Sequence, residues 1–202
     1  NCPNMKNFPM AITKMPELIS LNISNNKQWG ADDILAGMRG LATGPAAEKI
    51  QILYARQNQL EIMPKEFRNM KKLGLLDLAF NKIATIEAPY GKEFAPVQLY
   101  LDNNLIDYIP HDADGYYCGY DDVENFSVNY NKLKKVPNIF NSNNLYTMNS
   151  VSFGGNEIGT AEDGEMFEGE SNGTYKGIKV KTLTLSMNPL KKYPKAFADS
   201  NS

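Results

Sequence analysis

Residues 73–86 read LGLLDLAFNKIATI, and this stretch contains the pattern that decides the fold. Leu73, Leu76 and Leu78 are followed by Asn81 in the spacing LxxLxLxxN, in which x is any residue. The same spacing, with other apolar residues at some leucine positions, ends in an asparagine seven times along the chain: at Asn26, Asn58, Asn81, Asn104, Asn131, Asn156 and Asn188. A period of about 20 to 30 residues predicts a solenoid, in which each repeat buries its apolar face against its neighbours.

The middle of each repeat predicts a short β-strand, because apolar and polar residues alternate there. In the third repeat Leu76 and Leu78 flank Asp77, and this period of two places both leucines on one buried face. The asparagine at the ninth position follows the strand, where its side-chain amide can bond backbone groups of its own turn and of the neighbouring one. We therefore interpret the seven asparagines as structural residues and not as ligand contacts.

The repeats resemble those of leucine-rich repeat proteins over nearly the whole chain, from about Met5 to Phe197. This resemblance implies a right-handed α/β solenoid with a parallel β-sheet on the concave face and short helical, 3₁₀ or irregular segments on the convex face. We expect residues 1–202 to form a single domain of about seven complete repeats, with a partial repeat at each end, in a longer protein. In its abundance of lysine and asparagine, the chain resembles bacterial cell-surface or secreted members of this family. This resemblance implies an extracellular or cell-surface location, and an intracellular location stays open.

Insertions lengthen some repeats, because the spacing between asparagines grows from 23 residues in the most regular repeats to 32 after the first and the sixth. The first insertion, around residues 29–38, has an acidic start and apolar spacing that predict a short helix on the end or convex side. A second covers residues 111–122, and the third, residues 159–177, is acidic and glycine-rich, which predicts a solvated excursion. Apolar residues three apart in residues 9–18 and 64–73 predict short helical or 3₁₀ turns on the convex face.

The composition excludes several partners. Hydrophobic residues make up 42% of the chain, charged residues 22%, and the net charge is -2. The sequence has no basic patch of the kind that indicates nucleic-acid binding. No run reaches the roughly 18 apolar residues that a membrane span requires. We therefore expect neither nucleic-acid binding nor membrane insertion within this chain.

One segment has some features of a metal site and of a catalytic site. Residues 112–115 read DADG, part of a calcium loop, but the glutamate required six residues after the glycine is replaced by Asp121. His111 is the only histidine, and no nucleophile near it has a recognisable setting. The sequence therefore predicts no metal, no cofactor and no enzymatic activity.

Ligand contacts are predicted on the concave sheet, at residues between and just after the paired apolar positions. Exposed tyrosine and arginine are enriched in the residues that dominate binding energy at interfaces, and repeats two to five are rich in them. We predict seven contact residues: Tyr54, Arg56, Asp77, Phe80, Tyr100, Asp102 and Tyr130.

Three interpretations of this cluster remain open. The favoured one is recognition or adhesion, in which the concave face binds a protein or peptide, possibly of a host. In the second, the aromatic residues only stabilise the sheet, and the chain is a structural spacer or scaffold. In the third, Tyr54 or Tyr100 stacks on a sugar ring while Asp77 and Asp102 accept its hydroxyl hydrogens. A binding face would leave the aromatic residues exposed and contiguous, whereas a spacer would bury them.

Overall fold

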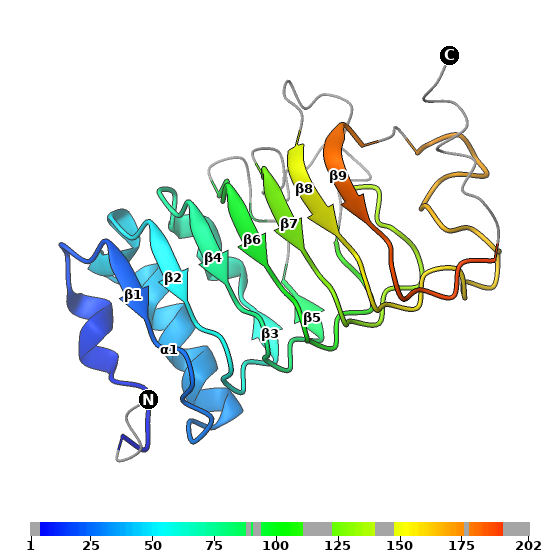
Figure 1. Cartoon of the computed structure of the whole chain (residues 1–202). Coiled ribbons are helices and arrows are strands. Elements are labelled where there is room, and N and C mark those ends of the chain that lie inside the picture. The colour runs from blue at the N-terminus through cyan, green and yellow to red at the C-terminus, as the bar shows by residue number, and fades with distance from the viewer. Residues whose placement is uncertain are drawn as a thin grey trace.

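The structure, a computed structural model, describes residues 5–87, 90, 94–110, 123–139, 148–175 and 178–191. It confirms the predicted α/β solenoid with a parallel sheet (Figure 1). Each repeat contributes one strand to a seven-stranded sheet, and the strands follow the order of the repeats: β1 (Ser20–Asn22), β2 (Ile52–Tyr54), β4 (Leu75–Asp77), β6 (Gln98–Tyr100), β7 (Asn125–Ser127), β8 (Met148–Ser152) and β9 (Val180–Thr184).

The strand register explains why the repeat folds as it does. Leu53 pairs with Leu76, and Leu76 pairs with Leu99, so equivalent positions of successive repeats form one row. All three side chains are fully buried. A repeat that lost this row would leave its own apolar face and that of its neighbour exposed to water.

The repeated asparagines have the predicted structural role. The Asn58 Nδ2 donates to the carbonyl oxygens of Ala55, in its own repeat, at 3.0 Å and of Ile23, in the preceding repeat, at 3.1 Å. Its Oδ1 accepts the backbone N–H of Asn26 at 3.1 Å. Asn81, Asn104, Asn131 and Asn156 bond in the same way, and they are buried. Each amide therefore ties one turn to the next.

The returning side of the coil is short and irregular, as predicted. It contains the 3₁₀ turns η1 (Met10–Lys14), η2 (Pro45–Glu48) and η3 (Lys65–Asn69). A second, two-stranded sheet pairs β3 (Ile62–Met63) with β5 (Thr85–Ile86) below the ends of the main strands in Figure 1.

The helix predicted in the first insertion is present as α1 (Ala31–Thr43), which lies behind β1 and β2 and packs on η1 and η3 (Figure 1). Ile34, Met38 and Leu41 point into the core with no exposed surface. Arg39 leaves the helix on the convex side and donates to Glu66 at 2.5 Å and to Glu87 at 2.9 Å. The insertion thus adds a helix to the convex layer.

The prediction of a solvated excursion at residues 159–177 is wrong for its centre. Met166 and Phe167 are buried, because Phe167 forms a parallel β-bridge with Val136 and its ring packs edge-on against Tyr175, with centroids 5.0 Å apart. The apolar pair therefore extends the convex layer, whereas residues 162–164 and 171–174 are exposed. The insertion at residues 111–122, with the weighed calcium loop and His111, lies outside the described residues.

Candidate binding face

The sheet brings three predicted residues together from three repeats. Tyr54 pairs in register with Asp77, and Asp77 pairs with Tyr100. Neighbouring strands are about 4.8 Å apart, so these side chains form one row across β2, β4 and β6. Leu53 and Leu76 point to the opposite face, into the core, because successive residues of a strand alternate.

Asp77 differs from the accessible contact residue that the sequence predicts, since its side chain is only 4% exposed. Its Oδ2 accepts a hydrogen bond from Arg56 Nη1 at 3.0 Å, and its Oδ1 accepts the backbone N–H of Ala79 at 3.1 Å. The guanidinium carbon of Arg56 lies 5.3 Å from the ring centroid of Phe80, in cation–π geometry. Asp77 therefore fixes the more exposed Arg56 next to Phe80.

Asp102 is tied into a hydrogen-bond chain that runs towards later repeats. Its Oδ1 accepts from Ser127 Oγ at 2.5 Å and from the backbone N–H of Asn129 at 2.7 Å. The Asn129 Oδ1 accepts in the same manner from Ser152 Oγ and from Gly154 N–H, both at 2.6 Å. In repeats four to six, these polar groups therefore bond to one another.

Tyr100 lies between the two carboxylates. Burial, followed by electrostatic interaction with Asp77, Tyr54 and Asp102, raises the pKa of its phenol above the ordinary value of 10. The phenol therefore stays protonated at neutral pH, and it bonds to Gln98 Oε1 at 3.1 Å.

Phe80 and Tyr130 are not strand residues. They follow the strands and directly precede the asparagine that ends the repeat pattern. Their φ angles are +59° and +53°. They are 41% and 51% exposed, respectively. The sequence pattern located them on the binding side but could not show that their backbone is left-handed.

A further row was missed by the sequence analysis. When the first leucine of LxxLxLxxN is counted as position one, Tyr54, Asp77 and Tyr100 stand at position five. Position three is two residues earlier, so alternation along the strand places both positions on the same face. Ile52, Leu75, Gln98 and Asn125 occupy this position and are partly exposed. The alternation along the strand carries the signal for this row, which lies just before the apolar pair and not between or after its members.

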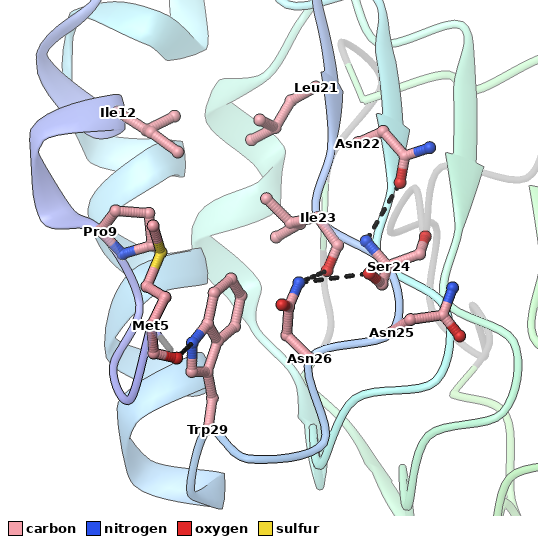
Figure 2. A pocket seen from close by; sticks show the side chains of 10 residues that line it. All are labelled: Met5, Pro9, Ile12, Leu21, Asn22, Ile23, Ser24, Asn25, Asn26 and Trp29. Carbon is pink, nitrogen blue, oxygen red and sulfur yellow. Dashed lines mark hydrogen bonds between the residues drawn. The ribbon is translucent and has the colours of Figure 1, made fainter. Parts of the chain in front are cut away.

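A pocket of about 410 Å³ lies at the open edge of β1 (Figure 2). It separates η1 from the strand and is lined by apolar side chains such as Ile12, Leu21 and Trp29. Two of the polar groups that line it already have partners: the Trp29 indole donates to the Met5 carbonyl at 3.0 Å, and Asn26 Nδ2 donates to the Ile23 carbonyl at 2.8 Å. We assign no ligand to it.

Two features are absent from the described residues. No three His, Cys, Asp or Glu side chains among them gather in a way that could hold a metal ion. No helix in the same part of the chain has the length and apolar character needed to cross a membrane.

The seven stacked repeats, the parallel sheet and the buried asparagines define the class: the chain is a leucine-rich repeat protein. No protein-family model matches it. Two solved structures are similar over almost all of its length. A leucine-rich repeat protein from Bacteroides eggerthii aligns at 34% identity and a TM-score of 0.86, over 100% of this chain and 33% of that chain. Another, from Bacteroides thetaiotaomicron, aligns at 39% identity and a TM-score of 0.80, over 97% and 23%.

Two curated proteins are also similar. Lumican of Gallus gallus is 28% identical over 148 residues, which are 70% of this chain and 39% of lumican. Fibromodulin of Oryctolagus cuniculus is 30% identical over 101 residues, which are 48% of this chain and 65% of that protein. The chain thus spans less than two thirds of the length of each of these four proteins.

Proposed function

We propose that this chain is a non-enzymatic recognition or adhesion module that binds a protein or peptide through its concave sheet face. The observation that carries the proposal is the cluster of Tyr54, Arg56, Phe80 and Tyr100 across β2, β4 and β6. Tyrosine and arginine dominate the binding energy of many interfaces. A contiguous, partly exposed group of them is what a binding face requires.

The polar partners of this cluster support binding because they order it in advance. Arg56 is held by Asp77, which is buried, and by the Phe80 ring. A side chain that is already fixed loses less conformational entropy when a ligand binds. In this proposal Tyr54, Arg56, Phe80, Tyr100 and Tyr130 contact the partner, whereas Asp77 and Asp102 position their neighbours.

The same geometry favours a protein ligand over a sugar. A sugar site would need the Asp77 and Asp102 oxygens as acceptors for sugar hydroxyls. Both oxygens of Asp77 and one of Asp102 already accept hydrogen bonds from the protein. Similarity to two Bacteroides proteins supports a bacterial origin, and an extracellular or cell-surface location follows from the proposed recognition role.

The test is a screen of the wild-type chain and a Tyr54→Ala/Tyr100→Ala variant against arrays of extracellular proteins, peptides and glycans. A matched control, Ser150→Ala/Thr182→Ala, changes the same sheet face in repeats six and seven. Circular dichroism first establishes that all three proteins are folded. We expect a protein or peptide that binds the wild type and the control but loses about 30-fold or more in affinity for the tyrosine variant. Glycans alone as ligands, or full binding by the tyrosine variant, would overturn the proposal.

A further inference from the structure

One position of the repeat has the same unusual backbone in every repeat. The residue directly before the asparagine has a positive φ angle in all seven, between +53° and +66°. L-amino acids adopt this left-handed region with strain, and asparagine and glycine tolerate it best. The residues found there are Asn25, Gln57, Phe80, Asn103, Tyr130, Gly155 and Met187.

Three of these seven residues are large and apolar, although the backbone does not favour them. Phe80, Tyr130 and Met187 are also strongly exposed, and Met187 is the most exposed of them at 72%. Burial in the core therefore does not account for their presence. Strained residues that the core does not require cluster at functional sites.

The surroundings of Tyr130 join two of these side chains into one surface. A Cβ atom added to Gly155 would lie 2.5 Å from the Tyr130 ring, so the ring occupies the space that any other residue at position 155 would need. The Tyr130 hydroxyl reaches Met187 Sδ at 3.5 Å. The ring thus lies across repeat six and meets the methionine of repeat seven.

The polar members of the row have free hydrogen-bonding capacity. The side-chain amides of Gln57 and Asn103 flank Phe80, and neither has a hydrogen-bond partner among the described residues. An extended chain presents free backbone N–H and C=O groups to such amides, whereas a helix bonds its own. The row from Phe80 to Met187 crosses four strand spacings, about 19 Å, which an extended chain covers in about six residues.

We propose that Phe80, Tyr130 and Met187 form an apolar rim that binds an extended segment of a partner protein, about six residues long, with a large apolar side chain near each end. This inference rests on the proposed function and names the chemistry of its ligand.

The test uses a phage-displayed library of random dodecapeptides, selected on the wild-type chain. The rim variant is Phe80→Asn/Tyr130→Asn/Met187→Asn, which introduces the residue that the chain itself has at Asn25 and Asn103. The control variant, Met15→Asn/Ile19→Asn/Leu105→Asn, removes three other exposed large apolar side chains. Calorimetry measures the affinity of each selected peptide, and thermal unfolding measures Tm.

We expect selected peptides to share two large apolar residues about five positions apart and to bind the rim variant about 30-fold more weakly or worse. The control should bind within about twofold of the wild type. The rim variant should keep its Tm or gain a few degrees, because asparagine relieves the left-handed strain. A marked fall in Tm would indicate a packing role and overturn the rim.

Other outcomes separate this inference from the proposed function. Peptides that bind the rim variant as tightly as the wild type, but lose affinity for Tyr54→Ala/Tyr100→Ala, overturn the rim and leave the sheet face as the binding site. Failure to select any peptide also overturns the rim. The protein array then decides the proposed function independently.

Discussion

The first and the third insertion are attached to the solenoid in different ways. The first contains α1, which buries Ile34, Met38 and Leu41 completely. The third, residues 159–177, buries the apolar pair Met166 and Phe167 beside the carboxylate of Glu165. The first insertion therefore adds a whole helix face to the common core, whereas the third combines a small apolar contact with polar groups.

A single cation bridging two acids joins each of these insertions to the rest of the coil, but the two bridges differ in burial. Arg39 contacts Glu66 and Glu87 on the partly exposed convex surface. Lys135 contacts Asp163 and the nearly buried Glu165. Hydrogen bonds from Ser171 and from Lys135 outweigh burial and lower the pKa of Glu165 from 4.5 to about 2. Only the second attachment should respond strongly to acid.

The largest effect is expected where apolar burial holds α1. Met38→Ala removes a side chain with no exposed surface, and such a change costs about 2–5 kcal/mol in free energy of unfolding. Chemical denaturation measures it. Met15→Ala, at a methionine that is 48% exposed, is the matched control and should change the free energy little. Equal effects of both substitutions would show that α1 does not stabilise the coil.

The second effect concerns the buried carboxylate. Glu165→Gln removes the negative charge to which Lys135 and Ser171 donate hydrogen bonds. We expect the free energy of unfolding to fall by about 1–3 kcal/mol. Hydrogen exchange should increase first at residues 165–171 and not in the sheet. Glu162→Gln, in the exposed turn, serves as the control. Unchanged exchange in the Glu165 variant would contradict the assigned role of this side chain.

The same carboxylate predicts a pH dependence with a definite sign. The folded pKa of Glu165 lies below its ordinary value of 4.5, so its contribution to stability is complete above that value. The contribution decreases as the pH falls from about 5 towards 2, because the unfolded chain takes up the proton first. The free energy of unfolding of wild type should therefore fall more steeply over this range than that of Glu165→Gln. Parallel profiles would contradict the lowered pKa.

A smaller effect is expected at the exposed bridge of the first insertion. Arg39→Met removes the contacts to Glu66 and Glu87 but keeps the aliphatic stem, and surface pairs contribute about 1 kcal/mol or less. Added salt should reduce the difference from the wild type, because exposed charges are screened. Arg68→Met, at another exposed position nearby, is the control. A difference that persists at high salt would indicate that packing, not charge, is lost.

The smallest effect is expected at Asp163. Its side chain is 52% exposed, and Lys135 keeps its contact with Glu165 when Asp163 is changed to Asn. The denaturation midpoint should stay within experimental error of wild type. A loss as large as that of Glu165→Gln would mean that the exposed acid, and not the buried one, attaches the insertion.

Much of the fold could be predicted because its signals are local and repeated. The alternation around Leu76 and Leu78 predicted a strand, and the ninth-position asparagines predicted amide bonds between turns. The helical spacing of Ile34 and Met38 predicted α1. Met166 and Phe167 gave no such period, because an isolated apolar pair among acidic residues shows neither helical nor strand spacing. Their burial depends on a partner, Val136, that lies 31 residues from Phe167 in the sequence.

The candidate site was predicted in composition but not in geometry. The aromatic and charged residues were identified from their positions in the repeat, and the register then placed Tyr54, Asp77 and Tyr100 in one row. Sequence alone could not distinguish the buried Asp77 from the more exposed Arg56. That distinction depends on the distance between side chains of adjacent repeats.

The sequence by itself determined the repeat, the strand in each repeat and the asparagines that join the turns, because periodic burial is recorded in residue spacing. Only the tertiary structure decided which polar groups satisfy one another and which remain free for a partner. It also showed the left-handed backbone at Phe80, Tyr130 and Met187. The physical reason is that hydrogen bonds and exposure depend on neighbours brought close by stacking, and their separation in the sequence does not specify them.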